Sequence, residues 1–311
     1  MTTRNAVCGV LLGALVLTSC AASEPGARFN LDLATFGGLQ LWSDVAWSEG
    51  ARVQRHAWTG HHRLLDASNV RRAWGSEAHC RDELDALEEG RVEPAPEGQH
   101  LVVLLHGLWR TRASLARMQQ ALEQDGYRVA TLSYASSQGT VDEHAACVAR
   151  VLDRQRGVER VSFVTHSLGS RVVQRLTERE DAWRERIDLA HVVQLAPPNQ
   201  GSRLARAARH LAPVRWVFGP TLDELIAPSP RTATESLGVI AGVRGQSGGW
   251  NPLLGGDDDG VVSLRETRAG QPHEHLSVEA AHTFVMNDAE AIEATRRFLR
   301  TGAFAPDTQS P

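Results

Sequence analysis

The feature that most constrains this chain is an alternation of apolar runs and helical stretches that begins near His100. The first run, Leu101-Val102-Val103-Leu104-Leu105, is apolar at every position, which is typical of a strand buried on both faces. A helical stretch at 113–125 follows it. Because this alternation builds βαβ units, we expect an α/β fold with a mostly parallel sheet flanked by helices.

The alternation continues through most of the remaining chain. We predict further strands at 127–134, 161–165, 191–196, 239–244 and 276–280 and helices at 141–156, 168–179 and 287–300. Together these elements define one domain at residues 100–300. Residues 202–237 are mostly helical and are interrupted by prolines, and we interpret them as a small cap.

The regions on either side of this domain do not show the same alternation of strands and helices. Residues 39–99 are rich in Trp, Arg and His, with a strand-like alternation at 51–58 and a helical stretch at 79–89. They are too aromatic to be disordered, so we interpret them as an N-terminal extension packed on the main domain. Residues 301–311 are predicted to be a flexible tail.

The first residues have the pattern of an export signal. Arg4 precedes an apolar run, 7–17, that is too short for a membrane-spanning helix. Leu17-Thr18-Ser19-Cys20 resembles the lipobox of bacterial lipoproteins, in which the cysteine becomes the lipidated first residue. We therefore expect a lipoprotein signal peptide at 1–19, with cleavage at another small residue as the alternative.

The lipobox resemblance also implies a location. Ala21 follows the cysteine, and by resemblance to Gram-negative lipoproteins it favours the outer membrane, facing the periplasm. The expected partner is thus a membrane, reached through a lipid anchor on Cys20 that buries methylenes at ~0.8 kcal/mol each. Residues 20–38 are small and polar and are predicted to form a tether.

Export also bears on the two remaining cysteines, Cys80 and Cys147. An oxidising compartment permits a disulfide between them, and we expect that bridge. Two buried thiols are the alternative, because spacing alone does not show that the side chains meet.

Composition excludes several classes of function. A formal net charge of -4 with 23% charged residues gives no basic excess, so nucleic acid is not an expected partner. The sequence contains no zinc-type cysteine pair, no P-loop and no GxGxxG after a strand. We therefore expect neither a metal nor a cofactor.

The candidate nucleophile is Ser167. The strand at 161–165 ends in Thr165-His166-Ser167-Leu168-Gly169, and a helix follows at once. A serine at a sharp strand-to-helix turn exposes its Oγ above the helix N-terminus. Strand and helix nearly touch there, so small neighbours are needed: Gly169 fits, whereas Thr165 departs from the usual glycine. A simple serine N-cap is the alternative.

Residues 100–300 resemble the α/β-hydrolase superfamily, and within it small bacterial lipases and esterases, including class 2 and GPI-inositol-deacylase-like lipases. Several motifs occur in the same order, and the first 99 residues are not covered. The resemblance implies a serine hydrolase that cleaves carboxylic esters through an acyl-enzyme and takes a small-molecule or lipid ester as substrate.

The resemblance also implies an oxyanion hole. The segment from Leu104 to Trp109 matches a His-Gly turn that directs a backbone N–H at the developing oxyanion. The matching donors are the N–H groups of Leu108 and Leu168. His106 is interpreted as a structural residue that holds this turn.

The acid and base follow from position in the same family. Asp259 precedes the glycine of an Asp-Gly-x-Val segment, with Asp257 as the second choice. A solvated acidic loop and a calcium site are the alternatives. His282 stands just beyond the last strand. Ser167, Asp259 and His282 occur in the order that α/β-hydrolases use.

The sequence defines the substrate and the type of reaction only as broad classes. The small cap favours esters of short to medium acids, and the indoles at 109, 216 and 250 are candidates either for an acyl pocket or for core packing. Acyltransferase or thioesterase activity would use the same machinery. A non-catalytic envelope lipoprotein that keeps the fold as a scaffold is the alternative from another class.

Overall fold

A computed structural model describes residues 33–90, 98–210 and 221–305 of the 311-residue chain. The signal peptide, Cys20, Trp216 and most of the predicted tether and tail lie outside these ranges. Among the helices within them, none is long and apolar enough to span a bilayer.

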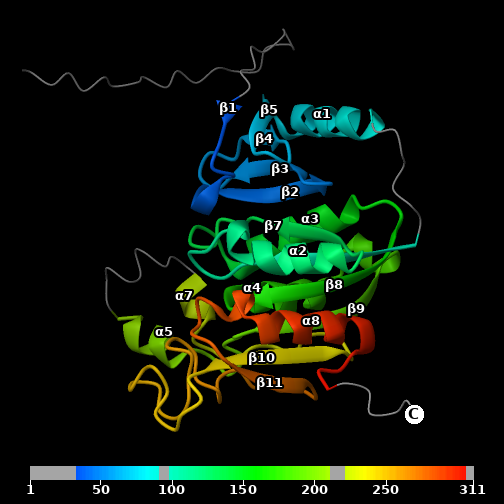
Figure 1. Cartoon of the computed structure of the whole chain (residues 1–311). Helices are drawn as coiled ribbons and strands as arrows, with labels where there is room; N and C mark the ends of the chain where they lie inside the picture. The colour runs from blue at the N-terminus through cyan, green and yellow to red at the C-terminus, as the bar shows by residue number, and fades with distance from the viewer. Residues whose placement is uncertain (1–32, 91–97, 211–220, 306–311) are drawn as a thin grey trace, which may run out of the picture. The chain divides into compact units, whose positions relative to one another are not determined.

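Six parallel strands form the main sheet in the order β11-β10-β9-β8-β6-β7 (Figure 1). Their bounds are β6 Gln99–Leu105, β7 Arg128–Leu132, β8 Val158–His166, β9 Asp188–Leu195, β10 Leu237–Val243 and β11 Glu274–Glu279. All neighbouring pairs run parallel. The prediction of an α/β fold with a mostly parallel sheet is confirmed.

Helices cover both faces of this sheet because β6 is apolar at every buried position. Leu101, Val103 and Leu105 pack with one cluster that includes α3 (Val141–Asp153) and α4 (Leu168–Glu178). The alternate residues Val102 and Leu104 pack with a second cluster. That cluster is built from α2 (Ala116–Gln124) and α8 (Ala289–Thr301) (Figure 1). Period-two alternation along one strand therefore serves two cores.

Short elements complete the domain. They are η2 Arg112–Leu115, η3 Ala182–Glu185, α5 Arg203–Ala208, α7 Thr221–Glu224 and η4 Val285–Asn287. The predicted cap contains α5 and α7. Asp288 caps α8, since its side chain accepts from the backbone N–H groups of Glu290 and Ala291.

The N-terminal extension is a second sheet, five-stranded and antiparallel, in the order β1-β5-β4-β3-β2. Its elements are β1 Leu33–Ala34, η1 Leu39–Leu41, β2 Trp42–Ser48, β3 Ala51–His56, β4 His62–Leu65, β5 Val70–Gly75 and the helix α1 Glu77–Glu89. β1 falls within the predicted tether at 20–38, so the predicted tether extends too far: residues 33–34 pair with β5 and belong to this sheet. The strand and helix that the sequence indicates at 51–58 and 79–89 correspond to β3 and α1. The other four strands have no counterpart in the sequence prediction.

A buried polar network ties β2 to the segment that follows β7. One carboxylate oxygen of Asp44 accepts from the Ser133 N–H at 2.6 Å, and the other accepts from Gln54 Nε2 at 2.7 Å. Arg52 Nε lies 3.7 Å from the same carboxylate, and both charged side chains are fully buried. Burial raises the pKa of Asp44, while the Arg52 charge opposes that rise. The pair is therefore desolvated and depends on its hydrogen bonds.

The expected disulfide between Cys80 and Cys147 is wrong for this structure, in which both thiols are free. Cys80 belongs to the apolar cluster beneath the antiparallel sheet, and Cys147 packs against the same cluster from α3. Cys80 instead receives a backbone hydrogen bond from Leu64. Burial raises the pKa of Cys80 to about 12 and that of Cys147 to about 11, so both behave as small apolar side chains.

Candidate active site

Ser167 lies at the turn between β8 and α4, at the carboxyl end of the parallel sheet. Its backbone has φ 51° and ψ −113°, a left-handed conformation that non-glycine residues rarely adopt. The Ser167 N–H donates to the carbonyl of Leu195 at 2.9 Å and fixes the turn to β9. A Cβ at Gly169 would lie 2.7 Å from the Leu105 carbonyl oxygen, so only glycine fits between α4 and β6.

Thr165 departs from the family pattern, and its hydroxyl forms a hydrogen bond that lets the larger side chain fit at this turn. The side chain is fully buried, and its Oγ1 lies 2.9 Å from Ser170 Oγ in the first turn of α4. The larger residue therefore forms a hydrogen bond across the turn, and the elbow keeps its strained geometry.

Asp259 and His282 are brought into direct contact. His282 Nδ1 donates to Asp259 Oδ2 at 2.7 Å, and the carboxylate is fully buried. The other oxygen, Oδ1, accepts from the N–H groups of Val261 and Val262 at 2.9 and 2.7 Å. These bonds fix the carboxylate in one orientation and direct the other ring nitrogen of His282, Nε2, away from it.

His166 links this pair to the nucleophile turn. Its Nε2 donates to the His282 carbonyl at 3.0 Å, and the two imidazole rings lie 4.8 Å apart. Burial lowers the pKa of His166 well below its ordinary value, so the ring is neutral. Because His166 directly precedes Ser167, the bond holds the His282 loop next to the serine.

The neighbouring aspartates have separate functions in the loop. Asp257 accepts from the N–H groups of Arg244 and Gly245 at 2.9 and 3.2 Å, at the end of β10. Asp258 accepts from Trp250 N–H at 3.0 Å and is fully buried. Of the three carboxylates, Asp259 is the one bonded to His282, which favours it over the second choice.

The two expected oxyanion donors flank Ser167. Leu168 is the first residue of α4, where a helix leaves N–H groups without an intrahelical acceptor. Leu108 lies in a turn closed by a bond from Arg110 N–H to the Gly107 carbonyl at 3.1 Å. A Cβ at Gly107 would lie 3.2 Å from the Ser167 Cβ, so this turn packs directly against the serine.

His106 occupies a structural position beneath the turn, as the sequence indicates. Its ring stacks on Tyr134 with centroids 4.3 Å apart, and its Nδ1 donates to the Gly107 carbonyl at 2.9 Å. The Tyr134 hydroxyl donates to the carbonyl of His106. Burial lowers the pKa of His106 to about 4, so it is neutral at pH 7.

Several residues that belong to no sequence motif contact the turn at 107–110. Trp109 N–H donates to Ser136 Oγ at 3.1 Å, and Gln40 contacts both Ser136 and the carbonyl of Arg110. The Arg110 side chain donates to Thr283 Oγ1 at 2.6 Å, next to His282. These contacts join segments that are far apart in the sequence, so no local pattern could have indicated them.

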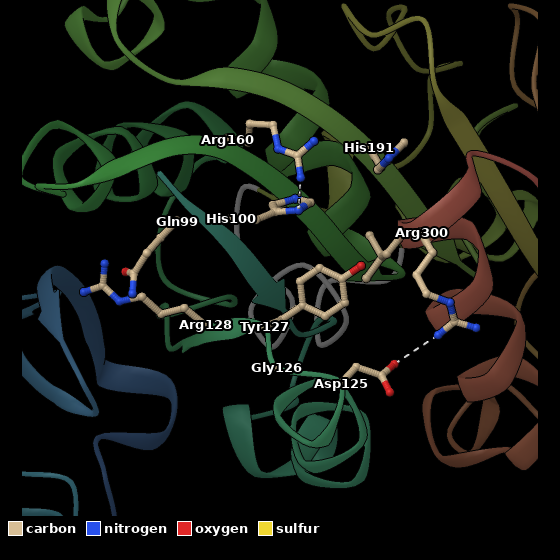
Figure 2. Close-up of a pocket in the computed structure, with 10 residues that line it drawn as sticks. Gln99, His100, Asp125, Gly126, Tyr127, Arg128, Arg160, His191 and Arg300 are labelled. Carbon is tan, nitrogen blue, oxygen red and sulfur yellow. Dashed lines mark hydrogen bonds and ion pairs between the residues drawn. The ribbon is translucent and has the colours of Figure 1, made fainter. Parts of the chain in front are cut away.

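A separate hollow of about 470 Å³ lies at the opposite, amino-terminal ends of the strands (Figure 2). Arg160, near the start of β8, donates to His100 Nδ1 at 3.3 Å, and Arg300 pairs with Asp125 at 3.3 Å. Ser167 stands at the other end of the same strand. This hollow is therefore distinct from the candidate active site.

Comparison with known proteins locates the family likeness in the nucleophile half of the domain. Residues 95–205 match the family model described as "Putative serine esterase (DUF676)". The match contains Leu108 and Ser167 and ends before Asp259 and His282. A comparison with the sequences of curated proteins finds no match.

Two solved structures of one bacterial enzyme share the fold. The Bacillus licheniformis lipase BlEst2 in mature form is 18% identical with a TM-score of 0.50, over 68% of this chain and 94% of that one. Its propeptide form is 17% identical with a TM-score of 0.52, over 71% and 53%. These two structures confirm the predicted fold, and the family match supports a carboxylic ester hydrolase as the class of enzyme.

The neutral His106 predicts an acid-sensitive fold. Because the pKa is about 4 in the folded protein and about 6.5 when unfolded, its contribution to stability is present above pH 6.5 and lost as pH falls toward 4. From pH 7 to pH 5 the loss is about 2 kcal/mol. Urea unfolding at these pH values measures it.

The variant His106→Gln is the control. It is expected to be less stable at pH 7 but to lose less stability between pH 7 and pH 5 than the wild type. The other buried histidines are present in both proteins, so the difference between the slopes reports the removal of His106. Equal slopes would contradict the prediction.

Proposed function

We propose that this chain, whose fold is that of the α/β-hydrolases, hydrolyses carboxylic esters with Ser167 as nucleophile, His282 as base and Asp259 as acid partner. The observation that carries the proposal is the 2.7 Å bond from His282 Nδ1 to Asp259, beside a serine in a strained strand-to-helix turn. Neither the His–Asp pair nor the strained backbone is expected beside a serine that only caps a helix.

The chemistry follows from the orientation of these groups. Asp259 keeps the proton of His282 on Nδ1, so Nε2 takes the Ser167 proton as the hydroxyl attacks the ester carbonyl. The N–H groups of Leu108 and Leu168 stabilise the tetrahedral oxyanion, where losing one donor costs about 3 kcal/mol of barrier stabilisation. His282 then protonates the leaving alcohol, and water hydrolyses the acyl-enzyme in a second cycle.

Three exposed apolar side chains support an ester with an apolar acyl group. Trp109, Val261 and Phe284 are 45%, 40% and 63% exposed, and each lies within two residues of a proposed oxyanion donor, the acid or the base. Trp250 is 53% exposed and is covered on one side by the guanidinium of Arg244. Large apolar surface beside reactive groups is suited to contact with an acyl chain.

The location we propose is the outer membrane, facing the periplasm, with Cys20 as the lipidated residue. The lipobox sequence and the small, polar tether after it support this. A small-molecule or lipid ester in the envelope would then be the substrate.

The proposed nucleophile and acid can be tested with one matched set of variants. A fluorophosphonate probe should label the wild type and not Ser167→Ala. Asp259→Asn should lower kcat for p-nitrophenyl acetate by up to about 10⁴-fold, because the His282 tautomer is no longer fixed. Asp257→Asn, in the same loop, should stay within about tenfold of the wild type. Labelling of neither protein would favour a scaffold over an enzyme, and labelling of Ser167→Ala would show that the nucleophile is a different residue.

Substrate preference should depend on Trp109. Burying one methylene contributes about 0.8 kcal/mol, so kcat/KM for p-nitrophenyl esters should rise up to about fourfold per added methylene until the pocket is filled. Trp109→Ala should flatten that dependence. Trp58→Ala, which removes an exposed indole bonded to Gln138, is the control. An unchanged chain-length profile in Trp109→Ala would refute the acyl contact.

The lipid anchor is tested by acylation of the expressed full-length chain. Wild type should incorporate labelled palmitate and sediment with membranes, whereas Cys20→Ser should do neither. If Cys20→Ser is still acylated, the lipidated residue is a different one.

A further inference from the structure

One polar side chain that lies next to the N-terminal sheet contacts the oxyanion turn, the turn at 107–110 that contains Leu108. Gln40 lies in η1, just before β2, and its amide is used at both ends. Its Nε2 donates to the Arg110 carbonyl at 2.7 Å, and its Oε1 accepts from Ser136 Oγ at 2.7 Å. These contacts join residues 70 and 96 positions apart in the chain.

Ser136 relays the contact to the backbone of the turn. Its hydroxyl is fully buried and accepts from the Trp109 N–H at 3.1 Å while donating to Gln40. The peptide group that joins Leu108 to Trp109 is therefore held through Ser136, and the Arg110 carbonyl, two residues further along, is held by Gln40 directly. Trp109 has φ 58°, a left-handed conformation that depends on such external bonds.

The Gln40 amide satisfies two opposite requirements at once. The Arg110 carbonyl needs a donor, whereas the Ser136 hydroxyl, which already accepts from Trp109, needs an acceptor. A carboxylate at position 40 would serve Ser136 but repel the carbonyl, and an apolar side chain would serve neither.

The segment that carries Ser136 is itself fastened to β2. The Asp44 N–H donates to the Ser133 carbonyl at 2.9 Å, and the Asp44 carboxylate accepts the Ser133 N–H in return. Ala135 N–H donates to Ser43 Oγ at 3.1 Å. Gln40 and Ser136 therefore contact the turn from segments that are hydrogen-bonded to each other.

We infer that Gln40 is a positioning residue, which holds the Leu108 N–H in the orientation that receives the oxyanion. The N-terminal sheet is then part of the active site, although it supplies no reacting group. The inference rests on the proposed function, because it assumes that Leu108 stabilises the transition state formed at Ser167.

The test compares Gln40→Ala with Gln119→Ala. Gln119 is also a partly buried amide used at both ends, since it donates to Glu123 and accepts from Thr131, but it lies in α2. Gln40→Ala should lower kcat for p-nitrophenyl acetate about 10- to 100-fold with KM changed less than threefold, because an oxyanion donor acts in the transition state. Gln119→Ala should keep kcat within about twofold of the wild type. Thermal unfolding should give the two variants similar Tm values.

Ser136→Ala breaks the same relay at its other end. The double variant with Gln40→Ala should be no slower than the slower single variant, because both substitutions release the same turn. Fully multiplicative effects would contradict a shared relay. If Gln40→Ala fails to fold, Gln40→Glu replaces it, since it keeps the size and the bond from Ser136 and should lower kcat in the same way.

The outcomes separate the two proposals. If Ser167→Ala loses activity while Gln40→Ala keeps kcat within twofold of the wild type, the proposed function stands and the positioning role is overturned. If Ser167→Ala keeps wild-type activity, the proposed function fails and the inference fails with it. A lower kcat that is matched by an equal loss in Gln119→Ala would indicate general destabilisation and would also overturn the inference.

Discussion

The close contact between α4 and β6 at Gly169 is the constraint on which the candidate site depends. The absence of a side chain there lets the helix begin immediately beside the Leu105 carbonyl, and this forces Ser167 into its left-handed turn. The same packing presents the α4 N-terminus beneath the serine hydroxyl, where its dipole favours developing negative charge. A single steric condition therefore sets the position of the serine, its exposure and its electrostatic surroundings.

Neutral imidazoles transmit this geometry to the surrounding loops. His166 is held between the Gly107 turn and the carbonyl of His282, so that the oxyanion turn and the base loop share one support. His106 stacks beneath the same turn and bonds to Gly107. Because burial keeps both rings uncharged at neutral pH, they act as fixed hydrogen-bonding spacers. Of these three histidines, His282 is the one that contacts a buried carboxylate.

The sequence predicts the parallel sheet and the places of Ser167, Asp259 and His282 because these depend on local patterns: apolar runs, a strand-to-helix turn and chain order. It does not predict β2, β4 or β5. β2 has the charged Asp44 in a continuous buried run, β4 has only four residues, and β5 buries only Ala73, so none of the three shows a clean alternation. The predicted strand at 127–134 extends two residues beyond the end of β7 at Leu132, because Ser133 bonds Asp44. Gln40 and Ser136 meet only in the folded chain. The expected Cys80–Cys147 bridge is not formed, and both free thiols pack at one apolar cluster, which spacing in the sequence does not indicate.

The bond between Asp44 and Ser133 also has a consequence for the order of folding. Asp44 and its partner Arg52 are made early in synthesis, yet the N–H that satisfies the carboxylate lies 89 residues further along the chain. Until that segment arrives, an antiparallel sheet formed alone would bury an incompletely bonded carboxylate, which is costly. The first sheet is thus thermodynamically incomplete while it is the only part present, and its consolidation should coincide with that of the parallel sheet. The two sheets are distinct in architecture but form a single cooperative unit in assembly.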